Sequence, residues 1–149
     1  MSLKALSRPA EVLLVDDNDD DAELLLIGFQ RAKVDVNIHR ARNGEECMAY
    51  LRREGEFAGA AVPDLILLDL NMPRMDGREV LAEMAADEDL QSVPVVVLTT
   101  SAARPDVLNA YKLQCSSYIV KAVDFEEFQE VIKAIANYWL SVVVLPTDV

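Results

Sequence analysis

The chain has 149 residues and a formal net charge of −12 at pH 7, and its length suits one domain with a substantial core. Hydrophobic residues make up 52% and charged residues 27%, an ordinary globular composition that excludes a disordered chain. The acidic balance argues against binding nucleic acid or an anionic membrane through bulk charge, and it favours basic partner surfaces and bound cations.

Five short apolar runs predict β-strands, and each is followed by a helical pattern. The strands are expected at residues 11–15, 36–41, 65–69, 95–99 and 118–120. Runs without polar alternation, such as LILL at 65–68 and VVVL at 95–98, are typical of parallel strands that are covered on both faces.

Apolar residues at helical spacing predict a helix after each strand. The five stripes are Ala22, Leu25, Leu26 and Phe29; Cys47, Tyr50 and Leu51; Val80, Leu81 and Met84; Val107, Ala110, Tyr111 and Gln114; and Phe125, Phe128, Ile132, Ile135 and Trp139. Asn18, Asn43 and Asp124 are placed as helix N-caps, and Pro105 suits a first helical turn. The (βα)5 alternation predicts an α/β fold with a doubly wound, five-stranded parallel sheet, whose binding crevice lies at the carboxyl ends of the strands.

Four of the predicted strands end in polar residues that could carry chemistry. These are Asp16 and Asp17, then Asp69, then Thr99, then Lys121. Each alone is an ordinary turn, strand or surface residue, but the fold brings these strand ends to one edge of the sheet. Three carboxylates suit a hard cation, and a site with few protein ligands favours Mg²⁺, which commonly also contacts phosphate.

Thr99 and Lys121 would then hold phosphoryl oxygens, one by a hydrogen bond and one by charge. A carboxylate can act as the nucleophile that forms an aspartyl phosphate. Asp69 is the best candidate, because it stands alone after the apolar LILL run.

Four segments together resemble the receiver domain of two-component response regulators, with the flavodoxin-like receiver fold. They are VLLVDDN (12–18), PDLILLDLNMPRMDG (63–77), VPVVVLTTS (93–101) and YIVKAVD (118–124). The likeness covers residues 11–139 and leaves an N-terminal extension at 1–10 and a C-terminal extension at 140–149. It implies phosphorylation of Asp69 by the phosphohistidine of a sensor histidine kinase, in a Mg²⁺-dependent reaction.

The resemblance also implies a role for each residue of the site. Asp17, Asp69 and the backbone carbonyl of Asn71 would bind Mg²⁺, with Asp16 acting through water. Thr99 and Tyr118 match the pair that changes position on phosphorylation. Asn71 and Ser101 match the positions that line the path of the hydrolytic water, and their small polar side chains predict a moderately long-lived phosphoaspartate.

The sequence departs from the family pattern at two places. Ala122 follows Lys121 where the family has proline, so the loop is either a strained cis bond or trans, and trans geometry could shift Lys121. Gln114 stands where the family has a glycine after the fourth helix. A left-handed residue there costs on the order of 1–2 kcal/mol, or the helix ends differently.

The C-terminal tail NYWLSVVVLPTDV (137–149) extends beyond the length of an ordinary receiver domain. Its apolar residues 142–145 either fold back on the core of the domain or pack on a second copy of the chain. With NGEECMAYLRREGEFAGAAVPDLILLDL (43–70), the tail resembles the single-domain regulators that are paired with bacterial phytochromes. That resemblance implies a phytochrome-type kinase as partner and a homodimer through the last helix and tail.

Three other functions fit the sequence less well. A phosphatase would need an Asp at position 71 and its nucleophile on the first strand. A calcium loop starting at Asp17 would need Gly and Glu at positions that hold Ala22 and Gly28, so this interpretation fails. A receiver-like scaffold that is never phosphorylated is the third alternative, and the presence of every acceptor residue argues against it.

No apolar run approaches the ~20 residues of a membrane span, and the N-terminus lacks a signal-peptide core. Two cysteines, Cys47 and Cys115, stand among apolar neighbours and are expected to be buried structural thiols. The single histidine, His39, is expected to be a packing or surface residue on the second strand. We therefore expect a soluble cytoplasmic protein, and the resemblance to receiver domains implies that it catalyses only its own phosphorylation and dephosphorylation.

Overall fold

The computed structural model describes residues 8–148, so residues 1–7 of the predicted N-terminal extension and Val149 lie outside the described residues. Five parallel strands form one sheet in the order β2-β1-β3-β4-β5. The strands are β1 (Ala10–Val15), β2 (Val36–Ala41), β3 (Leu65–Leu68), β4 (Val95–Thr99) and β5 (Ser117–Val120). The strand order reverses between β1 and β3, which confirms the doubly wound sheet and puts the switch point beside β1 and β3.

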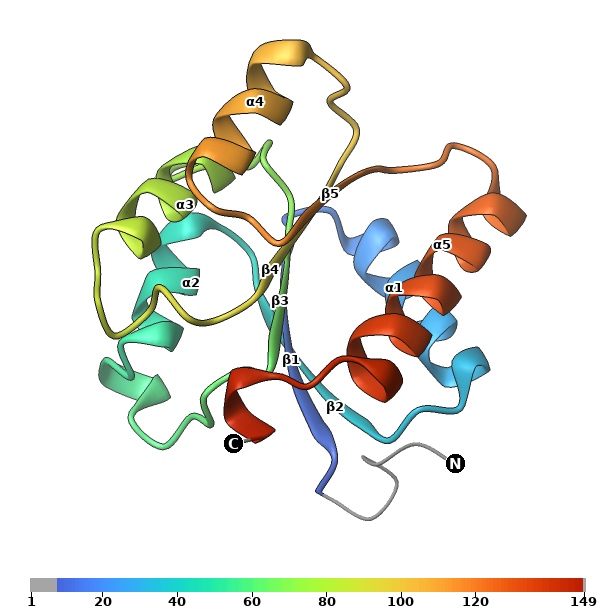
Figure 1. Cartoon of the computed structure of the whole chain (residues 1–149), viewed down its shortest axis with the longest axis horizontal. Helices are drawn as coiled ribbons and strands as arrows, with labels where there is room; N and C mark the ends of the chain where they lie inside the picture. The colour runs from blue at the N-terminus through green and yellow to red at the C-terminus, as the bar shows by residue number, and fades with distance from the viewer. Residues whose placement is uncertain (1–7, 149) are drawn as a thin grey trace.

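The helices cover both faces of the sheet (Figure 1). Helices α1 (Asp19–Ala32) and α5 (Phe125–Asn137) lie on one face. On the other face lie α2 (Gly44–Leu51), α3 (Gly77–Ala85) and α4 (Arg104–Lys112), with a short 3-10 helix, η2 (Gly55–Phe57), after α2. This arrangement makes a three-layer α/β domain, as predicted.

Side chains of the central strands enter two separate hydrophobic clusters, one on each face of the sheet. On β1, Leu13 and Val15 join the cluster under α2 and α3, whereas Val12 and Leu14 join the cluster under α1 and α5. All four are buried. Both faces of these strands are covered, and this explains why their sequences are continuous apolar runs.

The predicted helix starts are confirmed by side-chain caps. The Asn18, Asn43 and Asp124 side chains accept hydrogen bonds from the backbone N–H groups of the residues three positions later. Each bond satisfies one N–H group that has no partner within the helix. Pro105 lies in the first turn of α4, where its missing N–H has no cost.

Four residues of the predicted stripes are exposed instead of buried: three apolar residues and Gln114. Leu26 is 42% exposed, Tyr111 50% and Phe125 40%. Phe125 packs under the guanidinium of Arg31, 5.4 Å from its ring centroid. The hydroxyl of Tyr111 accepts a hydrogen bond from the backbone of Tyr118. The core positions of these helices are filled by their neighbours in the same stripes, so the stripes are narrower than predicted.

Helix α4 ends at Gln114, the position at which the receiver family has a glycine. The backbone of Gln114 is left-handed. Gln114 has φ 67°, its N–H bonds the Tyr111 carbonyl, and the next N–H, of Cys115, bonds the Ala110 carbonyl. This pair of bonds is a Schellman motif. The helix therefore ends where a glycine would end it, with a glutamine in the strained conformation.

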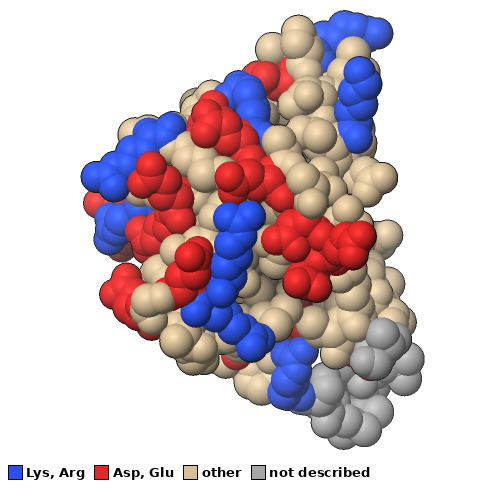
Figure 2. Space-filling model, turned by 90° about the vertical axis from the view of Figure 1, so that its left-hand side faces the viewer, with Lys and Arg blue, Asp and Glu red and all other residues tan. Residues whose placement is uncertain are grey.

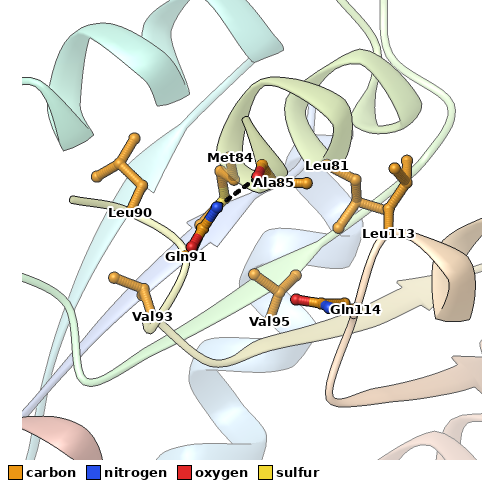
Figure 3. A pocket seen from close by; sticks show the side chains of 9 residues that line it. All are labelled: Leu81, Met84, Ala85, Leu90, Gln91, Val93, Val95, Leu113 and Gln114. Atoms are coloured by element: carbon orange, nitrogen blue, oxygen red, sulfur yellow. Dashed lines mark hydrogen bonds between the residues drawn. The ribbon is translucent and has the colours of Figure 1, made fainter. Parts of the chain in front are cut away.

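A small pocket of about 20 Å³ lies beside this helix end (Figure 3). Its lining residues include Leu81 and Met84 of α3 and, after α4, Leu113 and Gln114. Ala110 is the one described residue of α4 that is buried. Helix α4 is therefore the helix that hydrophobic packing holds least.

The C-terminal tail folds back across the end of the sheet where the strands begin (Figure 1). It consists of a π-helical segment, η3 (Tyr138–Val142), and a 3-10 turn, η4 (Pro146–Asp148). Leu140 and Leu145 are buried, whereas Val142 and Val144 are exposed. The tail is thus divided: part of it completes the core and part of it remains on the surface.

The buried carboxylate of Asp64 fastens the tail to the start of the chain. It accepts two hydrogen bonds of 2.7 Å from the guanidinium of Arg8, one of 2.6 Å from the backbone N–H of Glu11, and one from the hydroxyl of Thr147. Together, these donors hold the pKa of Asp64 below its usual value despite its burial.

By length and composition alone, the stretch Phe125–Asp148 could cross a membrane. Core helices of soluble proteins pass the same test, so the finding is weak evidence. Phe128, Ile132 and Ile135 are buried in the cluster that α1 and the sheet share. The apolar side of this stretch is therefore largely the core of the domain.

Candidate functional site

The carboxyl ends of β1, β3, β4 and β5 bring the predicted site residues together at one edge of the sheet. Asp69 is the first residue after β3, and the start of α3 approaches it closely. A Cβ atom on Gly77 would lie 2.3 Å from the carbonyl oxygen of Asp69, so this position accepts only glycine without a shift of the backbone. The Gly77 N–H donates to the carbonyl of Leu70 and fixes the loop between β3 and α3.

Three carboxylates converge at this edge. Oxygen atoms of Asp16, Asp17 and Asp69 all lie within 4.8 Å of one another. Asp16 and Asp69 are buried and Asp17 is exposed, so the cluster opens to solvent on the side of Asp17. Burial, which disfavours the charged form, raises the pKa of Asp16 even though Lys121 opposes that effect.

Lys121 lies among the carboxylates as a buried cation. Its Nζ donates to Asp16 at 2.8 Å, to Asp21 at 2.8 Å and to Asp69 at 3.2 Å. These partners raise the pKa of Lys121 against the effect of burial, so it stays charged. The Lys121–Ala122 bond is trans, as are all peptide bonds in residues 8–148, and Lys121 still reaches the site without the proline of the family.

Both oxygens of Asp69 have donors. Oδ1 accepts from the Thr99 hydroxyl at 2.8 Å and from the Asn71 N–H at 3.1 Å, and Oδ2 accepts from Lys121. Thr99 is fully buried. The Asp69 carboxylate is therefore oriented by one hydroxyl, one backbone amide and one ammonium.

Tyr118 and Ser101 are hydrogen-bonded to each other and not to Asp69. The Tyr118 hydroxyl donates to the backbone carbonyl of Ser101 at 2.8 Å, which ties β5 to the loop after β4. The Ser101 hydroxyl donates to the carboxylate of Asp106 at 2.6 Å. Of the predicted site residues, these two are brought near the site but do not contact Asp69 in the described hydrogen bonds.

Three residues that contact this constellation were not predicted as site residues. Asp21, in the first turn of α1, accepts a hydrogen bond from Lys121. It lies three residues after the N-cap Asn18, and nothing in the local sequence distinguishes it from Asp19 and Asp20. Arg78 forms a two-pronged ion pair with Asp106, both bonds at 2.8 Å. This pair joins segments 28 residues apart, so no local pattern announces it.

His39 lies on β2, away from these strand ends, as predicted. Its Nε2 lies 3.0 Å from a carboxylate oxygen of Glu11, and its ring stands 5.7 Å from that of Tyr50. The two cysteines are buried, and burial raises the pKa of the Cys47 thiol to about 12. None of these three groups takes part in the site.

A doubly wound parallel sheet with an acid cluster, a strand-end hydroxyl and a buried lysine at its carboxyl edge defines the receiver class of signalling domains. The family model of the response regulator receiver domain matches residues 12–133. The chain belongs to this family.

Relatives agree along nearly their whole length. Response regulator Rcp1 of Synechocystis sp. is 39% identical over 138 residues, which are 93% of this chain and 94% of Rcp1. The crystal structure of a phosphorylated cyanobacterial phytochrome response regulator, RcpA, is 43% identical, covers 93% of this chain and 99% of its own, and superposes with a TM-score of 0.89.

The structure of Rcp1 in its Mn²⁺-bound form also superposes with a TM-score of 0.89, at 39% identity, and covers 93% of this chain and 99% of its own. Carboxylate oxygens are the ligands that hard divalent cations prefer. The cluster of Asp16, Asp17 and Asp69 therefore fits a divalent cation.

Proposed function

We propose that this protein acts as a single-domain response regulator whose Asp69 accepts a phosphoryl group from the phosphohistidine of a sensor histidine kinase. One observation carries the proposal. The Asp69 carboxylate ends a buried strand, is held by Thr99 and Lys121, and shares a cluster with two further carboxylates. A nucleophile, two phosphoryl-binding groups and cation ligands are thus in one place.

In the transfer, a carboxylate oxygen of Asp69 bonds to phosphorus as the phosphorus–nitrogen bond of the donor breaks. The imidazole nitrogen keeps the electron pair and takes up a proton. Phosphoryl transfer depends on positioning and on neutralising charge more than on covalent help. Lys121, which stays protonated, would offset charge on the phosphoryl oxygens, and the Thr99 hydroxyl would donate to one of them.

Mg²⁺ is the cation that we propose for the acidic cluster. Asp17, Asp69 and the backbone carbonyl of Asn71 would hold it, with Asp16 acting through water. When bound, it would supply charge neutralisation at the phosphoryl oxygens. The fit rests on the spacing of the three carboxylates and on Lys121, whose ammonium already lies among the same acids.

Phosphorylation would be signalled through Thr99 and Tyr118. The Thr99 hydroxyl now bonds Asp69, and it would follow the phosphoryl group. Tyr118 holds the carbonyl of Ser101, so a shift of this loop would break that bond and allow the ring to turn inward. Asn71 and Ser101 would line the approach of the hydrolytic water and set the lifetime of the phosphorylated state.

A phytochrome-type kinase is the partner that the relatives support, because RcpA is a cyanobacterial phytochrome response regulator. We propose that the protein works in the cytoplasm, without nucleic acid or membrane, and modifies only itself. Figure 2 shows basic and acidic side chains intermixed on the face that α2 and α3 cover, where a nucleic-acid surface would be uniformly basic.

The tail is the proposed dimer element of the chain. Residues 11–139 would be the receiver, 1–10 an extension, and 140–149 the part that, with the last helix, joins a second copy. Three apolar residues that follow α5 are exposed, although α5 itself packs on the core. They are Tyr138 (56%), Val142 (70%) and Val144 (66%). Such apolar exposure supports a partner surface.

The proposal is tested by incubating the protein with a small phosphodonor and Mg²⁺. We expect a hydroxylamine-labile phosphate on the wild type and none on Asp69→Asn. Absence of labelling in the wild type would favour a scaffold that is never phosphorylated. Continuous turnover of many phosphate esters would favour a phosphatase.

A further inference from the structure

The guanidinium of Arg78 bridges two segments that flank Asp69. On one side it forms the two-pronged ion pair with Asp106 in the first turn of α4. On the other side it lies 3.4 and 3.5 Å from the side-chain oxygen of Asn71 and 3.4 Å from the carbonyl of Leu70. One side chain thus contacts both the loop after β3 and the helix after β4.

Asp106 passes this contact on to Ser101. Its Oδ2 accepts from Arg78 at 2.8 Å and from the Ser101 hydroxyl at 2.6 Å. The only proton of the Ser101 hydroxyl is therefore committed to Asp106, and its oxygen also accepts from the N–H of Ala103 at 3.3 Å, which leaves one lone pair as an acceptor. Because Arg78 and Ser101 both favour the charged carboxylate, the pKa of Asp106 falls to about 2, and the group stays ionised near neutral pH.

Helix α4 has little else to hold its first turn. Arg104 and Pro105 are exposed, and Ala110 is the one described residue of the helix that is buried. The other end of the helix borders the pocket of Figure 3. The position of Ser101 therefore depends on the Arg78–Asp106 pair and on the Tyr118 hydroxyl.

We infer that Arg78 is a positioning residue for hydrolysis of the phosphoaspartate, acting through Asp106 on Ser101 and directly on Asn71. The inference rests on the proposed phosphorylation of Asp69. In the step, a water oxygen bonds to phosphorus as the phosphorus–oxygen bond to Asp69 breaks. The carboxylate keeps the electron pair, inorganic phosphate leaves, and one proton goes to solvent. An acceptor-only Ser101 oxygen can take a hydrogen bond from that water and orient it.

The decay of phosphorylated protein after removal of the phosphodonor tests the role of Arg78. We expect Arg78→Gln and Asp106→Asn to slow the decay by about threefold to tenfold each, the size of one lost hydrogen bond. Arg104→Gln, an exposed arginine in the same helical turn as Asp106, is the matched control and should decay like the wild type. An unchanged or faster decay in Arg78→Gln would overturn the inference.

Two further readouts separate positioning from a general structural role. In a Ser101→Ala, Asn71→Ala background, Arg78→Gln should change the decay no further, because the groups it positions are gone. In the unphosphorylated, metal-free protein, Arg78→Gln should speed amide hydrogen exchange across residues 101–106. A full effect of Arg78→Gln in the double-alanine background would contradict the inference. Failure to label the wild type would contradict the proposed function instead.

Discussion

Lys121 and the acids around it explain why a chain gathers like charges after its first strand. Two carboxylates ~4 Å apart repel by roughly 4 kcal/mol at an effective dielectric of about 20. Here the ammonium offsets that repulsion by bonding Asp16, Asp21 and Asp69 at once. Asp19, by contrast, pairs with Arg40 and Arg42 on the surface. The acidic run VDDNDDD thus supplies carboxylates to two separate places, the cluster around Lys121 and the surface ion pairs with Arg40 and Arg42.

Asp17 is the exposed member of the carboxylate cluster, so its removal tests the cation site with the least disturbance to folding. We expect Asp17→Ala to abolish Mg²⁺ binding measured by titration calorimetry, because the cluster loses the ligand that faces solvent. Asp20→Ala, an exposed residue in the first turn of α1, should bind Mg²⁺ like the wild type and lose only a few tenths of a kcal/mol of stability. Equal Mg²⁺ affinity in both variants would contradict the proposed ligand set.

The predicted convergence of side chains is seen where a strand end fixes the position of a residue. Asp16, Asp69, Thr99 and Lys121 converge because parallel strands present their carboxyl ends at one edge. Arg78 and Asp106 could not be predicted in the same way. Their ion pair depends on where α4 lies relative to α3, and nothing in either local sequence encodes that distance.

The stability that helix α4 gains from the ion pair between Asp106 and Arg78 should depend on pH. The folded-state pKa of Asp106 is lowered to about 2, so its ion pair stabilises the fold above about pH 4 and this contribution is lost as pH falls toward 2. Urea unfolding of wild type and Asp106→Asn should differ at pH 7 and converge between pH 4 and 2. Asp89→Asn, at an exposed position, should differ little from the wild type at pH 7. A difference that grows on acidification would refute this account of the anchor.

The end of the same helix carries the second prediction. Gln114 is exposed and left-handed, with φ 67°, a conformation that glycine adopts without cost. Gln114→Gly should raise the free energy of unfolding by up to about 1 kcal/mol. Ser116→Gly, two residues later at a position without positive φ, is the control and should destabilise. Destabilisation by Gln114→Gly would mean that its side chain contributes more than the strain costs.

The elements themselves were largely predictable because period and caps agree. Five strands and five helices appear where alternation, N-caps and apolar stripes place them. The errors concern the width of the buried stripes: Leu26, Tyr111, Gln114 and Phe125 have the spacing of core residues but are exposed. Sequence spacing gives the side of a helix, and only packing shows how wide its buried stripe is.

For the whole molecule, the tail was the least predictable part, because folding back and dimerising both require apolar residues. The structure divides them by position. Leu145 is buried, with 2% exposure, whereas Val144 beside it is 66% exposed. Neighbouring residues of one apolar run thus face the core and the surface in turn.

This division yields a stability prediction with a built-in control. Leu145→Ala should lower the free energy of unfolding by about 2–4 kcal/mol through loss of buried contacts. Val144→Ala should cost less than about 0.5 kcal/mol in the monomer, as is usual for surface substitutions. Chemical unfolding at low protein concentration separates the two, and equal costs would contradict the assignment of Leu145 to the core.

The dimer proposal concerns the exposed apolar residues of the tail instead of the buried ones. A triple variant with Tyr138→Ser, Val142→Ser and Val144→Ser should show weaker self-association in sedimentation equilibrium. It should not show the loss of stability expected for Leu145→Ala. A wild-type chain that sediments as a monomer at every concentration would contradict the dimer.

The central claim is that this fold and this acid cluster make Asp69, and no other carboxylate, the phosphoacceptor. The most direct measurement is reduction of the phosphorylated protein with borohydride, which converts a phosphoaspartate to homoserine, followed by peptide mapping. The account predicts homoserine at position 69 alone, dependent on Mg²⁺ and on a phosphodonor. Homoserine at position 16 or 17, or none in protein that binds Mg²⁺, would contradict it.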